Sequence, residues 1–178
     1  MAALLSPVNS TNVRNQVVVL VPGTGDTRLD GFAVPLQDAG YQVVIVDPAR
    51  DGVMDGVIAG LEARGDRVVG FVGHSSGATA VASWLARTRR EARAVLIAPR
   101  ATHFAVERVR APALVIGDDS GLELARAWPD GRFSRIQAPD PGDAVVINDA
   151  VDFIARRVVF APPPAIGAAT FGAPAPLY

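Results

Sequence analysis

The chain has 178 residues, 49% of them hydrophobic, so it can bury one substantial core but is too short for two ordinary domains. Its 17 basic and 18 acidic side chains nearly balance, which argues against nucleic acid or an anionic membrane surface as a partner. The absence of cysteine excludes disulfides, thiol nucleophiles and thiolate metal sites, and two histidines do not favour a zinc centre. We expect no metal and no cofactor.

Nothing in the sequence matches a targeting or membrane signal. The first residues lack the basic start and apolar run of a signal peptide, and no stretch reaches the roughly 20 apolar residues of a membrane span. All of the basic residues are Arg and none is Lys, a bias typical of GC-rich bacterial genomes. We therefore expect a cytoplasmic, bacterial protein.

Short apolar runs rich in Val and Ile recur along the chain, each bounded by turn residues. Uninterrupted runs of this kind are typical of strands buried on both faces of a parallel sheet. They cover residues 17–21, 43–46, 68–72, 94–98 and 113–117, with a weaker sixth near 133–137. The sequence therefore predicts about six mostly parallel strands.

Segments of helical length separate these runs. They cover residues 31–39, 53–64, 76–90 and 122–127, and a last helix follows the sixth strand. In that helix, apolar residues from Val146 to Val158 share one stripe and polar residues share the other. The alternation predicts an α/β fold, a three-layer sandwich over residues 16–160. Residues 1–15 and the Pro/Ala-rich residues 161–178 are expected to be flexible.

One motif, at the carboxyl end of a predicted strand, is typical of a catalytic serine nucleophile. Residues 73–77 read Gly-His-Ser-Ser-Gly between a buried strand and a helix, which is G-x-S-x-G in the strand-turn-helix setting of a nucleophile elbow. The strained turn lifts the Ser75 hydroxyl above the sheet edge. Because the helix starts at the serine, the N–H of Ser76 points at any oxyanion formed on a carbon that Ser75 attacks.

From about Val17 to Arg157 the chain resembles the α/β-hydrolase family, as a small and nearly lidless member. The loop at residues 22–25, Pro-Gly-Thr-Gly, is similar to the family's loop that supplies a second oxyanion N–H. The resemblance implies that this N–H comes from Thr24, with Gly23 beside it. The implied fold is a minimal α/β-hydrolase fold.

The resemblance also implies an acid. Residues 110–120 are similar to the family's penultimate strand, which delivers the carboxylate of the catalytic triad. The commonest spacing falls on Ser120, so Asp119, or else Asp118, takes that role.

The family's base is missing from its usual place. A histidine normally follows a glycine in the loop after the last strand, but here Asp143 follows Gly142. The only histidines, His74 and His103, both precede the acid strand. A serine without a base is a poor nucleophile, since general-base help is worth about 10²- to 10⁴-fold.

Three groups are candidates for the missing base. His103 lies where larger relatives carry their lid and folds over the strand ends in this interpretation. His74 adjoins the nucleophile but is expected to point to the opposite side of the elbow. Asp143 becomes a usable base if it faces Asp118 or Asp119, because like charges raise the pKa of one carboxyl.

These patterns lead to three hypotheses about function. The first is serine-dependent hydrolysis or transfer of an ester or thioester acyl group through Ser75, with Asp119 as the orienting acid and His103 as the best available base. The second is a non-hydrolytic enzyme, a cyclase, lyase or isomerase, that uses Asp acid/base chemistry on a small molecule. The third is a catalytically degenerate hydrolase that only binds a ligand or partner.

Overall fold

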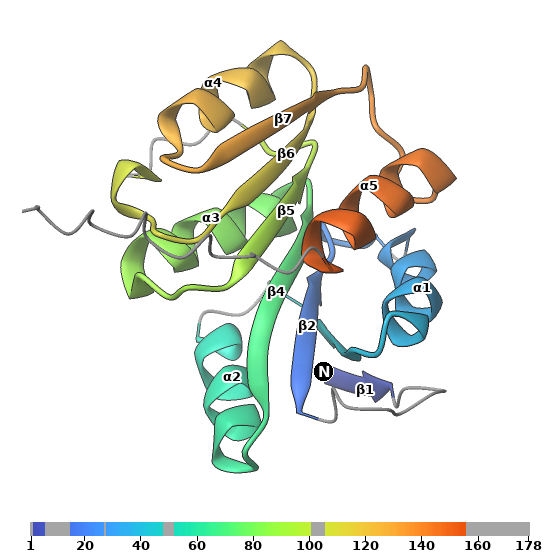
Figure 1. Cartoon of the computed structure of the whole chain (residues 1–178), viewed down its shortest axis with the longest axis vertical. Helices are drawn as coiled ribbons and strands as arrows, with labels where there is room; N and C mark the ends of the chain where they lie inside the picture. The colour runs from blue at the N-terminus through green and yellow to red at the C-terminus, as the bar shows by residue number, and fades with distance from the viewer. Residues whose placement is uncertain (1, 6–14, 27, 48–51, 101–105, 156–178) are drawn as a thin grey trace, which may run out of the picture.

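A computed structural model describes residues 2–5, 15–26, 28–47, 52–100 and 106–155. The described residues form a seven-stranded sheet in the order β1-β3-β2-β4-β5-β6-β7 (Figure 1). The strands are β1 (Ala2–Leu5), β2 (Gln16–Val21), β3 (Gln42–Val46), β4 (Arg67–His74), β5 (Arg93–Ile97), β6 (Ala113–Gly117) and β7 (Gly131–Arg135). Strands β2 to β7 are parallel, and β1 is antiparallel to β3.

The helices lie between the strands, as the alternating pattern predicts. They are α1 (Ala33–Asp38), α2 (Val53–Ala63), α3 (Ser76–Thr88), α4 (Asp119–Ala127) and α5 (Ala144–Ala155), with short 3₁₀ helices η1 (Arg28–Phe32) and η2 (Val106–Arg108). None of the helices in the described ranges combines the length and apolar character needed to cross a bilayer. The predicted fold class, an α/β protein with a mostly parallel sheet, is confirmed.

The sheet differs from the prediction at its edge. Residues 2–5 were expected to be flexible, whereas the structure pairs Ala2 with Val46 and Leu5 with Val43. A run of four apolar residues gives no periodic signal, and its pairing depends on the free edge of β3, which is distant in sequence. The predicted flexible tail, 161–178, lies outside the described residues.

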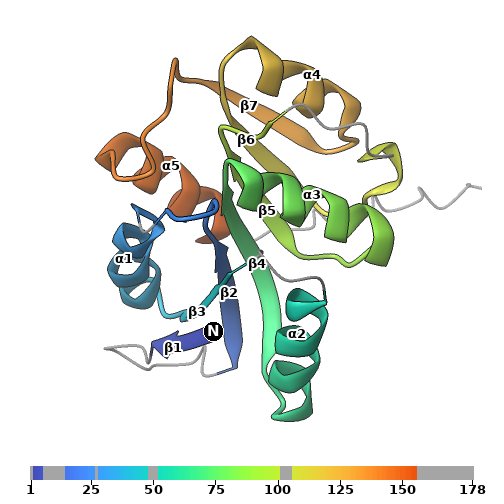
Figure 2. The ribbon, with the colours of Figure 1, turned by 180° about the vertical axis from the view of Figure 1, so that it is seen from behind.

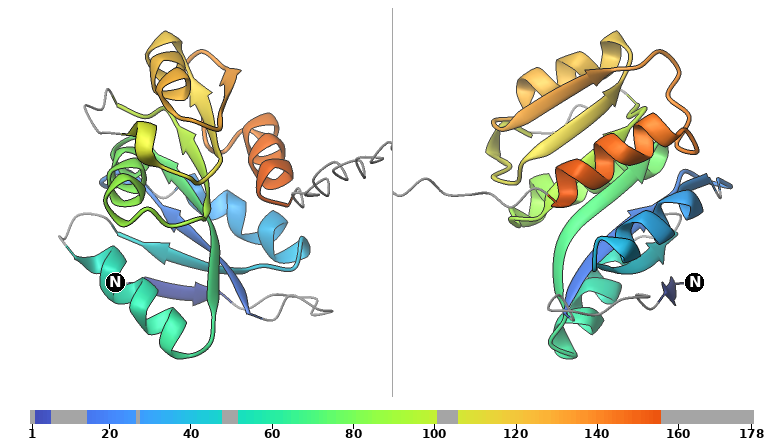
Figure 3. Two further views of the ribbon diagram at one scale, coloured as in Figure 1. Left: turned by 60° about the vertical axis from the view of Figure 1, so that its left-hand side comes forward. Right: turned by 45° about the vertical axis from the view of Figure 1, so that its right-hand side comes forward.

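Helices cover both faces of the sheet (Figures 2 and 3). Along β2, Val17 and Val19 belong to the core cluster that includes buried residues of α2, α3 and α4, whereas Val18 and Leu20 belong to the cluster that includes those of η1, α1 and α5. Successive side chains of a strand point to opposite faces, so an uninterrupted apolar run fills both cores. This arrangement is the three-layer sandwich expected from the sequence.

Strand β4 occupies the centre of the sheet and carries the candidate site at its end. It lies between β2 and β5, and its last residue, His74, pairs with Ile97. Because the parallel strands end at one edge, the loops that follow β2, β4 and β5 meet there. Phe71, fully buried in β4, packs against Trp84 of α3 with 5.3 Å between ring centroids, which holds the helix against the strand.

Candidate active site

The turn from β4 into α3 is a strained elbow. Ser75 has φ 53° and ψ −118°, a conformation that residues with a Cβ rarely adopt. A Cβ on Gly77 would lie 1.9 Å from the carbonyl oxygen of Val21, and one on Gly73 would lie 2.6 Å from the Cα of Ala78. Both glycines are therefore required for the helix to start directly against the sheet.

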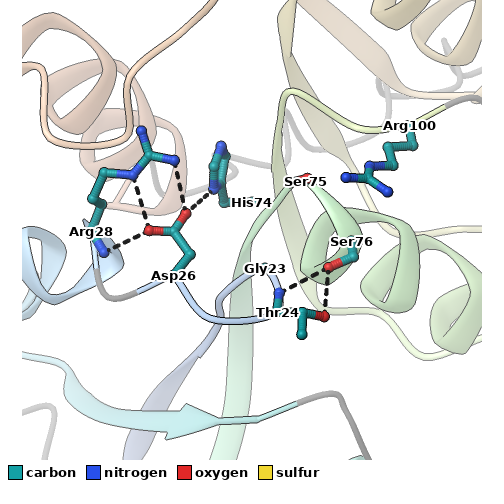
Figure 4. Close-up of a pocket in the computed structure, with 8 residues that line it drawn as sticks. All are labelled: Gly23, Thr24, Asp26, Arg28, His74, Ser75, Ser76 and Arg100. Carbon is teal, nitrogen blue, oxygen red and sulfur yellow. Dashed lines mark hydrogen bonds and ion pairs between the residues drawn. The ribbon is translucent and has the colours of Figure 1, made fainter.

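A pocket of about 220 Å³ surrounds this elbow (Figure 4). It is lined by Gly23, Thr24, Asp26, Arg28, His74, Ser75, Ser76 and Arg100. The lining comes from the segment after β2, the elbow, and the segment after β5. Four residues that the sequence singled out as nucleophile or oxyanion site, Gly23, Thr24, Ser75 and Ser76, thus lie together.

The two segments of the predicted oxyanion site contact each other directly. The backbone N–H of Thr24 donates to Oγ of Ser76 at 3.1 Å, and the Oγ1 of Thr24 lies 3.5 Å from the same atom. A Cβ added to Gly23 would lie only 3.3 Å from the Cβ of Ser75, so glycine leaves room beside the elbow. In this arrangement the Ser76 hydroxyl accepts the hydrogen bond from the Thr24 N–H. An oxyanion could therefore bind this N–H only after displacing the Ser76 hydroxyl.

An ion-pair network beside the elbow was not predicted from the sequence. The Asp26 carboxylate accepts from the backbone N–H of Arg28 at 2.9 Å and from its guanidinium at 3.0 and 3.2 Å. The Nδ1 of His74 lies 2.5 Å from the Oδ2 of Asp26. The guanidinium of Arg28 also lies 3.7 Å from the carboxylate of Asp140. These contacts link the start of η1 to the end of β4.

The Asp26 carboxyl is strongly acidic. Its hydrogen bond from the Arg28 side chain is the largest cause that lowers its pKa from the usual 3.8 to about 2, and His74 adds to that effect. The side chains of His74 and Asp26 are only 8% and 11% exposed. Asp26 is therefore ionised at neutral pH and can only accept hydrogen bonds.

This ionisation settles which ring nitrogen of His74 carries the proton. Because Asp26 only accepts, Nδ1 of His74 must donate, which leaves Nε2 with the lone pair in the neutral ring. No described residue forms a hydrogen bond with Nε2. The sequence placed His74 on the side of the elbow opposite the nucleophile; in the structure His74 and Ser75 line one pocket.

The three predicted carboxylates lie elsewhere. Asp118 caps α4, accepting from the N–H and hydroxyl of Ser120 at 3.0 and 2.7 Å, and this hydroxyl is the main cause that lowers the pKa of Asp118. Asp119 pairs with Arg135 at 2.9 Å on the surface. Asp143 accepts from the N–H of Val145 at 2.8 Å as α5 begins.

None of these three described carboxylates lines the pocket around Ser75. Asp118 and Asp143 directly precede α4 and α5, and Asp119 is the first residue of α4; acidic side chains at such positions satisfy free backbone N–H groups or the helix dipole. Their roles as orienting acid or as acid/base pair remain predictions. The candidate base His103 lies outside the described residues.

Comparison with solved structures identifies the fold as that of the α/β-hydrolases. A monoacylglycerol lipase from Paleococcus ferrophilus matches with a TM-score of 0.70 and 14% identity, over 87% of this chain and 98% of the lipase chain. Est1E from Butyrivibrio proteoclasticus with bound ferulic acid matches with a TM-score of 0.65 and 11% identity, over 88% and 96% of the two chains.

An esterase domain from Rhodothermus marinus gives a TM-score of 0.65 at 15% identity, over 86% of this chain and 92% of that domain. No protein-family model and no curated protein sequence matches the chain. The resemblance predicted from the elbow and the loop before it is thus confirmed at the level of the fold.

Proposed function

We propose that the protein is a serine-dependent acyl hydrolase or acyltransferase in which Ser75 attacks the carbonyl carbon of an ester or thioester. The observation that carries this proposal is the strained conformation of Ser75, which precedes the first residue of α3 and lines the pocket. Strain of this kind is retained where surrounding structure enforces it for function. Among the described residues no hydrogen bond engages the Ser75 hydroxyl, so it remains available to a substrate.

The helix start supports the same chemistry. The N–H of Ser76 is one of the free donors of the first turn of α3, and the positive end of the helix dipole lies at that point. Such donors stabilise the negative charge that develops on the carbonyl oxygen, and one donor is worth about 10²- to 10³-fold in rate. The N–H of Thr24 is the second donor once the oxyanion displaces the Ser76 hydroxyl.

The charges of the pocket bear on the substrate. Asp26 is neutralised by Arg28, whereas Arg100 has no ion-pair partner among the described residues. Figure 4 shows the Arg100 side chain across Ser75 from the Asp26–Arg28 pair. The side of the pocket at Arg100 therefore carries a positive charge without a described partner, which favours neutral or anionic acyl groups over cationic ones.

The neighbours whose names describe an esterase or lipase are consistent with this proposal. The alternative of Asp acid/base chemistry has less support, because Asp118, Asp119 and Asp143 each accept hydrogen bonds outside the pocket. A degenerate binding protein would share the elbow but would lack an activated serine.

Reaction with a fluorophosphonate, followed by intact-mass measurement, tests the proposal. The wild type should gain one adduct, and Ser75→Ala should gain none. Ser134→Ala is a matched control, because Ser134 lies in β7 and donates to Asp149. Labelling that persists in Ser75→Ala would place the reactive group elsewhere, and an unreactive wild type would favour binding alone.

A further inference from the structure

Attack by Ser75 requires a base, and the pocket around Ser75 contains one imidazole among its described lining residues, that of His74. The family's usual position for the base is occupied by Asp143, which accepts the N–H of Val145 as α5 begins. By contrast, His74 lines the same pocket as Ser75 and has a carboxylate at Nδ1. A base held by a third group is the arrangement that activates a hydroxyl nucleophile.

We infer that His74, oriented by Asp26, is the base that accepts the Ser75 proton, through one water molecule in the pocket. The inference rests on the function proposed above. It assigns a catalytic role to a histidine that the elbow motif alone does not single out, and a positioning role to Asp26 and Arg28.

The burial of His74 supports this role. The residue is 6% exposed, and no described residue forms a hydrogen bond with its Nε2. Buried polar atoms are nearly always hydrogen-bonded, so an unpartnered ring nitrogen beside a pocket is expected to bind water or substrate. The pocket, of about 220 Å³, has room for several waters at about 30 Å³ each.

The inferred proton path runs through one water molecule because no direct contact joins the two groups. Ser75 follows His74 directly in the chain, and among the described residues no hydrogen bond joins the two side chains. Figure 4 shows His74 between the Asp26–Arg28 pair and Ser75. General bases act at hydrogen-bond distance or through one water, so the second route applies.

The proton balance is complete without a further group. As Ser75 Oγ bonds to the carbonyl carbon, its proton passes through the water to Nε2, and the carbonyl electron pair moves to oxygen. When the tetrahedral intermediate collapses, the bond to the alcohol or thiol breaks and the leaving group takes the proton from Nε2. A water molecule then attacks the carbonyl carbon of the acyl-enzyme and gives one proton to Nε2. When this second intermediate collapses, the bond to Ser75 Oγ breaks, the acid is released, and Oγ takes the proton back from Nε2.

The charged neighbours favour this cycle. When Nε2 is protonated, the imidazolium faces Asp26 at Nδ1, and Arg28 holds that carboxylate in the ionised state. Asp140 lies beyond Arg28, and Arg100 lies across the pocket. Asp26 contacts the imidazole directly, whereas among the described residues no hydrogen bond or ion pair joins Arg100 to it.

The test measures the rate of fluorophosphonate labelling against pH. His74→Gln should label about 10²- to 10⁴-fold more slowly than the wild type and should lose the acid limb of the rate profile. Added imidazole should partly restore labelling of His74→Ala. Circular dichroism checks that both variants are folded. Ser134→Ala should label at the wild-type rate.

Asp26 is tested through the tautomer of His74. In ¹⁵N spectra the neutral ring of the wild type should carry its proton on Nδ1, and Asp26→Asn should weaken this preference and slow labelling. A proton on Nε2 in the wild type would overturn the inference.

Labelling of folded His74→Gln at the wild-type rate, or a loss confined to His103→Gln, would overturn the role of His74 and leave Ser75 as the nucleophile. A wild type that does not label at all would overturn both the inference and the function proposed for Ser75.

Discussion

Replacement of Asp26 by Asn removes the charge that Arg28 and His74 share. Its folded-state pKa of about 2, against the usual 3.8, corresponds to about 2 kcal/mol of stability at neutral pH. The Arg28 side chain is 55% exposed, so solvent screens part of this contribution. We therefore expect Asp26→Asn to lower the free energy of unfolding by about 1–2 kcal/mol at pH 7.

The dependence on pH has a defined sign. Because folding lowers the pKa of Asp26, its contribution is fully present above the unfolded value and is lost as the pH falls toward about 2. The difference between the wild type and Asp26→Asn should thus be constant near neutral pH and should shrink below about pH 5. At neutral pH the melting temperature should fall by about 2–8 °C.

Urea unfolding followed by tryptophan fluorescence at several pH values measures this difference. Asp66→Asn is a matched control: the Asp66 side chain is 13% exposed and pairs with Arg64 at 3.3 Å. Because Asp66 forms a single pair with an exposed arginine, Asp66→Asn should lower the free energy of unfolding by at most about 1 kcal/mol. Equal losses from Asp26→Asn at pH 7 and at pH 2.5, or no loss at pH 7, would refute the reasoning.

Other consequences concern the elbow, the core and the pocket. Gly77→Ala should prevent the elbow from forming, because its Cβ would lie 1.9 Å from the Val21 carbonyl oxygen, and thermal unfolding should show a loss above about 3 kcal/mol. Gly56→Ala, on an exposed position of α2 with nothing within 4 Å of the new Cβ, should instead stabilise by about 0.5–1 kcal/mol. Phe71→Ala should cost about 3–5 kcal/mol, since the ring is fully buried. Arg100→Gln should lower kcat/KM for anionic acyl esters by roughly two- to fivefold and leave neutral esters unchanged; an equal loss for both would contradict the charge argument.

The elements of the fold were predictable because their signals are local. Apolar runs such as 17–21 and 113–117 identify strands buried on both faces, and the structure places β2 and β6 there. The start of α4 was predicted too late, at residue 122, and the residues before it were interpreted as a loop that carries the acid, Asp119 or else Asp118. In the structure Asp118 is the N-cap of this helix.

The site was predictable only in part, because some of its contacts join residues that are far apart in the sequence. The elbow at Ser75 follows from five consecutive residues, whereas the contact between Asp26 and His74 spans 48 positions. That contact depends on β2 lying beside β4, with Val21 opposite Gly73. The available signal was that Asp26 and His74 both lie at the carboxyl ends of predicted strands, but the sequence does not reveal which strands are neighbours.

Locating the fluorophosphonate adduct tests the central claim most directly. Trypsin cleaves after Arg67 and Arg87, so residues 68–87 form one peptide that contains Ser75, Ser76 and Ser83. Fragmentation of this peptide should place the adduct on Ser75 alone. An adduct on Ser76, Ser83 or another peptide, or no adduct on the folded wild type, would contradict the assignment of Ser75 as the nucleophile.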